Sequence, residues 1–196
     1  MVIKRLFDLF FSILGLLLLF PILCFIGLMI KIDSKGPIFF RQNRIGKDGS
    51  VFSIYKFRTM KQDSSNNQLL TISNDPRITK VGSLIRKMKL DELPQLLNVI
   101  KGEMSLVGPR PESEDLIKYW PTEAKLKIQS VRPGMTDDAS ILYKNENVLL
   151  DNNDVALEKY IKEILPKKIK LYEEYIEKRS LVQDFKLIVR TLIKLM

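Results

Sequence analysis

The stretch LFFSILGLLLLFPILCFIGLMI, from Leu9 to Ile30, decides how the rest of this chain is organised. It contains 22 residues and no charged side chain. As an α-helix it would be about 33 Å long at roughly 1.5 Å per residue, which is enough to cross the apolar part of a bilayer. We therefore expect a membrane-inserted region in residues 1–35 and a separate domain in residues 36–196.

Two features of this segment favour a bent helix that enters and leaves the membrane on the same face. Pro21 lies near its middle, where a proline removes one helical hydrogen bond and kinks the helix. Basic residues flank both ends, so the positive-inside bias does not favour placing either end outside; they are Lys4, Arg5, Lys31, Lys35, Arg41 and Arg44. A plain crossing is the alternative that length alone supports. A cleaved signal peptide fits less well, because the apolar run is too long and no A-x-A site follows it.

Composition limits the chemistry that the chain can perform. Its 196 residues include 32 Lys and Arg against 23 Asp and Glu, a net charge of +9 that favours anionic partners. Cys24 is the single cysteine, so no internal disulfide can form, and a reducing compartment such as the cytosol is expected. The absence of histidine excludes Ser-His-Asp triads and removes the commonest zinc ligand. Because Gly-rich nucleotide-binding motifs are also missing, catalysis would have to use carboxylates, Lys, Arg, hydroxyls or a hard metal ion.

After Gly36-Pro37 the pattern predicts a small β-hairpin. Two apolar or alternating runs, Ile38–Phe40 and Val51–Arg58, are separated by a turn at Asp48-Gly49. Residues 61–75 are polar and predict a surface loop. Helical patterns dominate the rest, so the expected fold class is α+β and mostly helical.

Two helices and one rigid loop follow along the chain. Asp75-Pro76 predicts a helix start, with Ile78, Val81, Ile85 and Met88 on one face. Leu93-Pro94 predicts a short helix that ends at Gly102 and turns Leu93, Leu96, Leu97 and Ile100 to the core. Gly108-Pro109-Arg110-Pro111 predicts a rigid loop, because two prolines fix φ and remove two donors.

From about Asp154 the C-terminal part predicts helices that lie at the membrane interface. Pro166 is expected to divide the first from the second, and Ser180 with Gln183 to cap the third. One face of this last helix is apolar and the other carries Lys186, Arg190 and Lys194.

The candidate catalytic residues are Asp91 and Glu92, within Lys89-Leu-Asp-Glu-Leu-Pro-Gln-Leu96. Carboxylates are suitable ligands for Mg²⁺, and a carboxylate can act as a nucleophile toward phosphorus. Acids in a first helical turn are also common stabilisers of ordinary helices, so the pair needs further support. That support is a set of basic residues suited to phosphate: Lys56 and Arg58, which share a strand face, with Arg86, Arg110 and Arg132.

Three motifs make the chain recognisable. SIYKFRTM at Ser53–Met60, LIRKMKLDELPQLLNVIKGEMSLVGPRP at Leu84–Pro111 and VRPGMT at Val131–Thr136 resemble the bacterial sugar transferase family, whose small members are monotopic phosphoglycosyl transferases. The resemblance extends from Lys4-Arg5 to Thr136. It departs from the family pattern at Met135–Ile141, where many members carry a Gly-Leu-Ala-Gln-type stretch.

The resemblance implies an enzyme on the cytosolic face of the bacterial inner membrane. Asp91 would attack the sugar-bearing phosphorus of a UDP-sugar, expel UMP and hold the phosphosugar covalently until polyprenyl phosphate takes it. Glu92 would assist as acid-base or metal partner, with Mg²⁺ at the Asp91-Glu92 pair. Phosphate charge would be neutralised by Lys56, Arg58, Arg86, Arg110 and Arg132.

A non-catalytic, membrane-anchored basic module that binds anionic lipid or nucleic acid is the main alternative. The charge of +9 and the basic amphipathic C-terminal helix support it. Nucleic acid is disfavoured, because aromatic residues are not interleaved with the basic ones as stacking platforms. A glycosyltransferase with a metal-binding Asp-x-Asp triplet is also disfavoured, because no such triplet occurs.

Overall fold

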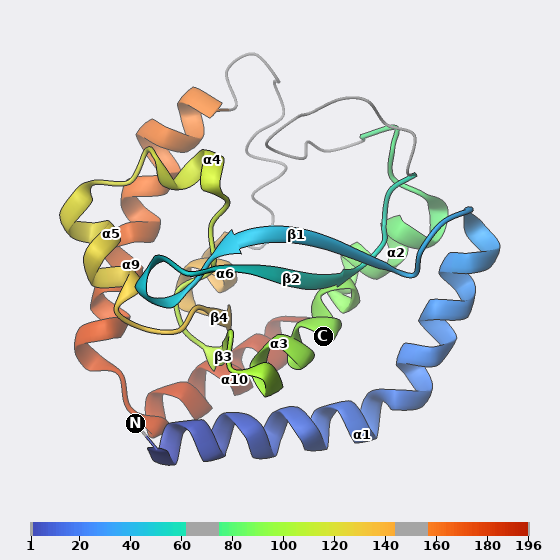
Figure 1. The fold of residues 1–196 in the computed structure, drawn as a ribbon, viewed down its shortest axis with the longest axis horizontal. Helices are drawn as coiled ribbons and strands as arrows, with labels where there is room; N and C mark the ends of the chain where they lie inside the picture. The colour runs from blue at the N-terminus through green and yellow to red at the C-terminus, as the bar shows by residue number, and fades with distance from the viewer. Residues whose placement is uncertain (1, 62–74, 144–156, 196) are drawn as a thin grey trace.

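The computed structural model describes residues 2–61, 75–143 and 157–195 (Figure 1). Most of the predicted 61–75 loop, and residues 154–156, lie outside these ranges. The described chain is mostly helical and contains two small sheets, which confirms the predicted α+β class. The main helices and strands are α1 (Val2–Asp33), β1 (Phe39–Ile45), β2 (Val51–Phe57), α2 (Lys80–Lys87), α3 (Leu96–Lys101), β3 (Ser105–Val107), α4 (Glu114–Ile117), α5 (Thr122–Gln129), β4 (Gly134–Thr136), α6 (Asp138–Leu142), α9 (Leu165–Lys178) and α10 (Leu181–Leu195).

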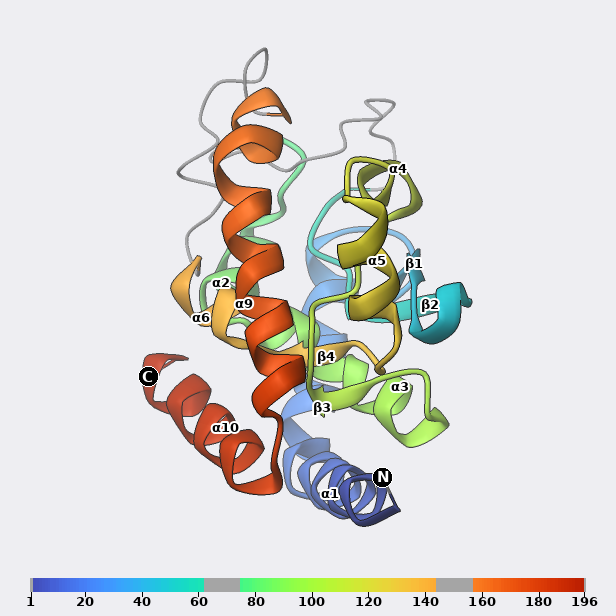
Figure 2. The same cartoon turned by 90° about the vertical axis from the view of Figure 1, so that its left-hand side faces the viewer.

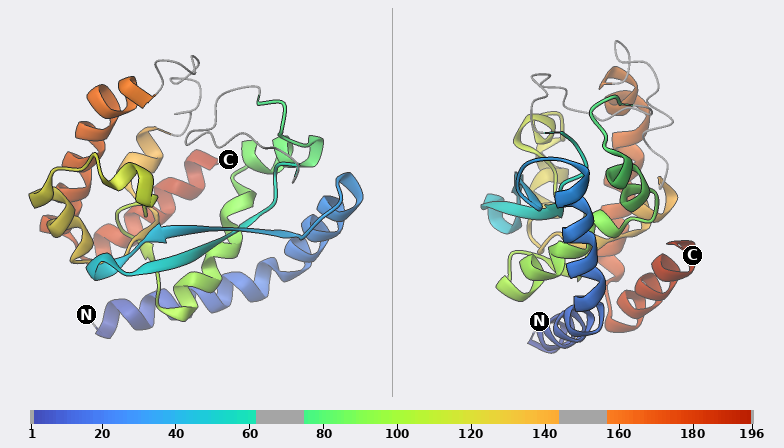
Figure 3. Two further views of the ribbon diagram at one scale, coloured as in Figure 1. Left: turned by 45° about the horizontal axis from the view of Figure 1, so that its top comes forward. Right: turned by 90° about the vertical axis from the view of Figure 1, so that its right-hand side faces the viewer.

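Helix α1 is long, apolar and bent, and the rest of the chain lies within the angle of its bend (Figures 1 and 3). Pro21 lies inside it, as the kink prediction requires. Its length and composition would allow it to cross a membrane, and only 17% of its most apolar window is buried, unlike the core helix of a soluble protein. Leu17 and Leu18 are 69% and 70% exposed, whereas Ile26 and Ile30 pack inward. The outer face of α1 therefore presents a continuous apolar surface.

The predicted β-hairpin is confirmed. Strands β1 and β2 pair antiparallel, and the turn between them places Asp48 at φ 55° and Gly49 at φ 76°. Phe52 packs in the core near α3, and Phe57 packs against the second half of α1. The hairpin thus runs from the side of α5 and α9 to the second half of α1 (Figure 1).

Helix α2 begins at Lys80, four residues later than predicted with Asp75 as cap and Pro76 as first residue. Its N-cap is Thr79, whose hydroxyl accepts a hydrogen bond from the Gly82 amide at 3.0 Å. The Asp75 carboxylate does not cap the helix, because it accepts hydrogen bonds from the Arg77 guanidinium. Met88, predicted on the packed face, is 49% exposed, while Ile85 is buried. A local ion pair has therefore displaced the expected helix start.

The segment after α2 is tighter than predicted. A 3₁₀ helix over Leu90–Gln95 precedes α3, and Gly102 at φ 88° ends α3 as expected. Because a 3₁₀ helix has three residues per turn, it shifts the phase of the following residues. Asn98 and Val99 consequently point inward, while Leu97, predicted to face the core, is exposed.

Pro166 does not divide two C-terminal helices. A π-helical turn over Tyr160–Ile164 precedes α9, which has the proline in its first turn. The wider π-helical turn accommodates the missing N–H of Pro166. Residues 160–178 therefore continue as one helix, called here the C-terminal rod. The predicted cap of the last helix is confirmed, since Ser180 Oγ accepts from the Gln183 amide at 3.2 Å. Figure 2 shows α10 leaving the end of α9 beside the beginning of α1.

Candidate active site

The two candidate acids lie in a strained connection between α2 and α3. Asp91 and Glu92 occupy the first turn of the 3₁₀ helix, and Lys89 before them has φ 57° and ψ 21°. This left-handed conformation is uncommon for a residue other than glycine and costs on the order of 1 kcal/mol. It turns the chain sharply at the end of α2 and brings the acids against β2. The strain at Lys89 is not visible in the sequence.

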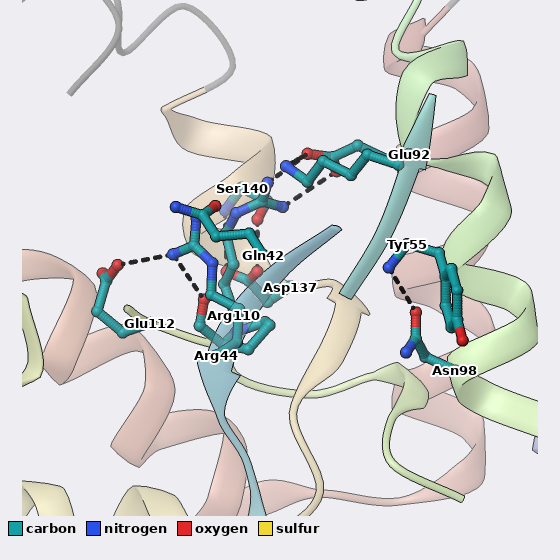
Figure 4. A network of polar contacts seen from close by, with 11 residues as sticks. Gln42, Arg44, Tyr55, Glu92, Asn98, Arg110, Glu112, Asp137 and Ser140 are labelled. Carbon is teal, nitrogen blue, oxygen red and sulfur yellow. Dashed lines mark hydrogen bonds and ion pairs between the residues drawn. The ribbon is translucent and has the colours of Figure 1, made fainter. Parts of the chain in front are cut away.

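Glu92 is fixed between two cations. Its carboxylate accepts from Lys56 Nζ at 2.9 Å and from Arg110 Nη1 at 3.1 Å, with a second, shorter contact from Arg110 Nη2 (Figure 4). Burial alone would raise the pKa of Glu92, but Arg110 and Lys56 outweigh it and hold that pKa well below its usual range. Glu92 is therefore a permanent anion in this position.

Asp91 has the opposite environment. Its side chain is 8% exposed, and its buried Oδ1 has no hydrogen-bond partner among the described residues. Burial, followed by the neighbouring charge of Glu92, raises the pKa of Asp91, while Lys56, Arg86 and Lys89 act in the other direction. A buried carboxylate oxygen without a partner is costly, and functional sites are where such costs concentrate.

Three of the five predicted phosphate-binding residues lie at this site. Lys56 and Arg110 contact Glu92 directly. Arg86 is close enough for its charge to act on Asp91, and its buried Nη1 has no hydrogen-bond partner in the described parts of the chain. A phosphate beside Asp91 would therefore meet an unused guanidinium donor.

Arg58 and Arg132 are not brought to the acids. Arg58 lies one residue beyond β2, and its Nη2 donates to the carbonyl of Ser34 at 2.7 Å and of Ile30 at 3.4 Å. It thereby satisfies carbonyls left free at the end of α1. Arg58 therefore does not join Lys56 at the acid pair, contrary to the expectation from the strand pattern. Arg132 is exposed and donates to the Gly102 carbonyl at 2.7 Å. Both geometries depend on contacts between segments that are distant in the sequence.

The arrangement agrees with the comparisons to known proteins. The chain matches the model of the bacterial sugar transferase family over residues 1–196. It belongs to this family. A UDP-glucose:undecaprenyl-phosphate glucose-1-phosphate transferase of Escherichia coli (strain K12) is 39% identical over 196 residues, covering 98% of this chain and 40% of that protein.

Two other relatives differ in length. An exopolysaccharide production protein of Rhizobium leguminosarum bv. phaseoli is 43% identical over 148 residues, covering 69% of this chain and 72% of the relative. A UDP-N-acetylgalactosamine-undecaprenyl-phosphate N-acetylgalactosaminephosphotransferase of Aeromonas hydrophila is 40% identical over 144 residues, covering 72% of this chain and 34% of that protein. The chain thus spans less than half of the Escherichia coli and Aeromonas relatives.

In this sugar transferase family member, the predicted proline loop holds Arg110 in place. Its Gly108 and Gly134 of β4 approach so closely that a Cβ built on Gly134 would lie 2.1 Å from the Gly108 nitrogen. Gly134 also donates from its amide to the Pro109 carbonyl at 2.9 Å. Backbone packing therefore fixes the loop on the side of β4.

A second group of residues supports the same loop from the other side. Glu112 accepts from Arg44 at 3.2 Å and from the Tyr160 hydroxyl at 2.8 Å, and Arg44 also donates to Gln42 (Figure 4). These residues connect the hairpin, the loop and the C-terminal rod. Sequence reasoning missed them, because none of them carries a local signal.

The segment that departs from the family pattern lies behind Arg110. Asp137 is buried and caps α6, accepting from the Ser140 amide at 2.9 Å and the Ser140 hydroxyl at 2.5 Å (Figure 4). Burial raises the pKa of Asp137, while Arg110 and Lys168 act against this increase. The departure therefore adds a carboxylate near Arg110 and leaves Asp91 and Glu92 unaffected.

Proposed function

We propose that this chain transfers a phosphosugar from a UDP-sugar to polyprenyl phosphate, releasing UMP, through a covalent intermediate on Asp91. The observation that carries the proposal is the contrast within the acid pair. Glu92 is held ionised by Lys56 and Arg110, while the buried Asp91 Oδ1 has no partner in the part of the chain that the structure describes. The names of the Escherichia coli and Aeromonas relatives support the acceptor and the donor class.

The reaction has two steps. An Asp91 carboxylate oxygen attacks the sugar-bearing phosphorus, the bond from that phosphorus to the bridging oxygen breaks, and UMP leaves with the electron pair. An oxygen of polyprenyl phosphate then attacks the same phosphorus and frees the Asp91 carboxylate, leaving a polyprenyl diphosphate sugar. Splitting the transfer in this way replaces one difficult step with two easier ones.

The neighbouring residues supply position and charge. Glu92 was expected to act as acid-base or metal partner, and because Lys56 and Arg110 keep it ionised, we assign it the metal-partner role. Its two ion pairs keep Lys56 and Arg110 aimed at the place where phosphate charge develops. Arg86 adds a free donor beside Asp91. We do not assign phosphate binding at this site to Arg58 or Arg132, because neither lies at the acid pair: Arg58 lies at the end of α1 and Arg132 beside Gly102.

Mg²⁺ fits the acid pair in part. The free oxygen of Asp91 is a hard ligand, and Glu92 lies next to it in the chain. No cluster of three or more acidic or sulfur ligands occurs among the described residues, so Mg²⁺ would take its remaining ligands from substrate phosphates and water. When bound, it would neutralise diphosphate charge.

Trapping the intermediate tests the proposal. Purified protein mixed with a UDP-sugar and Mg²⁺, but no lipid, should release UMP and gain one phosphosugar on the peptide that contains Asp91. Asp91→Asn is the control and should show neither change. A ternary-complex kinetic pattern, together with repeated absence of the adduct under active conditions, would overturn the two-step mechanism. Anionic-lipid binding without any UMP release would favour the basic-module alternative.

We also propose that α1 is re-entrant and places the acid pair at the cytosolic face of the inner membrane. The bend of α1, the presence of Pro21 within it, the exposed apolar outer face and the basic flanks support this topology. After Cys24 is replaced by serine, single cysteines at Val2 and Lys35 should both resist an impermeant thiol reagent in intact cells. Labelling at one of them from outside would mean that the segment spans the membrane.

A further inference from the structure

A cavity of about 340 Å³ is lined by residues from the beginnings of α1 and α10 and from β3. Figure 1 shows these elements close to the N-terminus. Its volume falls in the range of small-molecule sites. Neither Asp91 nor Glu92 lines it, so it is separate from the proposed catalytic site. The turn of the hairpin closes one side through Lys47, which also lines it.

The lining of this cavity is strongly positive. Two carboxylates, Asp8 and Asp184, face five basic side chains, which leaves three positive charges in excess; the basic residues are Lys4, Arg5, Lys47, Arg132 and Arg179. Such an excess in a recess attracts anions.

Both carboxylates are already satisfied by the protein. Asp184 accepts from Lys4 Nζ at 2.6 Å and from the Tyr175 hydroxyl at 2.9 Å. Asp8 accepts from the Ser105 hydroxyl at 2.9 Å and from a backbone amide at 3.2 Å. They therefore do not need the remaining cations as partners.

Two arginines at the rim keep free donors. Arg132 uses only Nε, on the Gly102 carbonyl, and its two terminal nitrogens have no partner within the described ranges. Arg179 makes no hydrogen bond or ion pair with any residue that the structure describes. By contrast, Arg5 donates to the Val99 and Ile100 carbonyls at 2.5 and 2.8 Å. Free guanidinium groups are suited to bidentate recognition of phosphate.

The surface beside the cavity is apolar. Ile3 on α1 is 69% exposed and Val182 on α10 is 65% exposed, although both helices line the cavity. A ligand that is anionic at one end and apolar at the other would match both surfaces. We propose that the cavity binds the phosphate headgroup of an anionic membrane lipid, with its acyl chains against α1 and α10. This inference rests on the membrane insertion in the proposed function, but not on the transfer chemistry.

Lipid enrichment tests this site without any assay of transfer. The full chain is reconstituted in vesicles of phosphatidylcholine that contain a minor fraction of phosphatidylglycerol, extracted into polymer nanodiscs, and analysed by native mass spectrometry. Two rim guanidiniums should enrich phosphatidylglycerol about thirtyfold over bulk, because each basic residue near a membrane surface is expected to contribute roughly fivefold. The double variant Arg132→Gln, Arg179→Gln should lose this enrichment. The control Lys170→Gln, Lys186→Gln removes the same charge from exposed positions outside the cavity and should keep it.

The outcomes separate the possible failures. Vesicle association with no enrichment, or equal enrichment in both double variants, would overturn the headgroup site while leaving the proposed function intact. Binding of inorganic phosphate in pure phosphatidylcholine nanodiscs, abolished by the rim variant, together with no lipid enrichment, would assign the site to a soluble phosphate instead. No association with any vesicle, measured by flotation, would overturn the membrane insertion on which the site rests.

Discussion

Two regions of this chain each bury a pair of carboxylates beside a lysine, and they differ in how completely those carboxylates are bonded. At the junction of α1 and α10, Asp8 and Asp184 both accept hydrogen bonds through two oxygens. At the acid pair, Glu92 is bonded through both oxygens, but the buried Oδ1 of Asp91 accepts no hydrogen bond from residues 2–61, 75–143 or 157–195.

The difference separates stability from chemistry. A buried acid with all its hydrogen bonds made holds segments together, here the first turn of α1, β3 and α10. A buried acid with an unused oxygen destabilises the fold slightly and keeps an electron pair available for substrate or metal. Identical residue types thus serve two purposes, which only their partners distinguish.

The largest effect is expected at the unused oxygen. Asp91→Asn should reduce transfer by about a thousandfold or more, because an amide is a poor nucleophile and removes a member of a unit that acts together. UMP release and radiolabelled lipid product would measure it, with circular dichroism showing that the fold persists. Near-normal turnover in this variant would remove Asp91 from the mechanism.

Glu92→Gln should have the next largest effect. Loss of the charge releases Lys56 and Arg110 from their fixed positions, so we expect transfer to fall by about a hundredfold, the size of a lost electrostatic contact in a preorganised site. Steady-state kinetics would measure the change. Glu103→Gln is a matched control, since it removes a carboxylate that bonds Asn98 instead of the acid pair. Equal losses in both variants would contradict the special position of Glu92.

Asp184→Asn should affect stability instead of chemistry. It weakens a buried contact to Lys4, which is partly exposed, so the free energy of unfolding should fall by about 2 kcal/mol. Thermal unfolding in detergent would show the loss, while UMP release per folded molecule stays close to that of the unchanged protein. A large loss of turnover without a loss of stability would mean that the two regions do not divide their roles as described.

The smallest effect is expected from the raised pKa of Asp91. Attack requires the ionised carboxylate, so activity should fall as pH decreases through a pKa that burial and Glu92 place above the ordinary 3.8. The same shift means that folding favours the neutral acid, and this favourable contribution is lost as pH rises through the raised pKa. Asp91→Asn should therefore unfold at a slightly higher temperature than the unchanged protein at neutral pH, and this difference should shrink in acid. If the unchanged protein were more stable than Asp91→Asn at neutral pH, the upward shift of the Asp91 pKa would be contradicted.

Features with local causes could be predicted from the sequence. The Asp48-Gly49 turn, the Gly102 helix end and the Ser180 cap each depend on a few adjacent residues, and each is confirmed. Lys56 and Arg110 were placed with the acids by the motifs and their charge, and the structure brings both to Glu92.

Features that depend on distant partners could not be predicted in this way. Helix α2 starts later than predicted because Asp75 forms an ion pair with Arg77 instead of capping the helix. Arg58 does not reach the acid pair because it donates to a carbonyl at the end of α1. The segment that contains Asp137 was noted as a departure from the family pattern, but its position behind Arg110 could not be predicted, since it follows from the packing of β4 against β3. Partner choice across the fold, rather than residue type, decided these positions.

The close approach of Gly108 and Gly134 sets a limit for anyone who wishes to redesign this molecule. Any side chain at Gly134 would collide with backbone, so it would displace the loop that carries Arg110, whatever its polarity. A combinatorial library should therefore hold both glycines constant and vary the neighbouring Met135 and Ser140, which are only partly buried. Natural variants of this chain are under the same restriction: the side chains around this crossing can change, but the two glycines cannot.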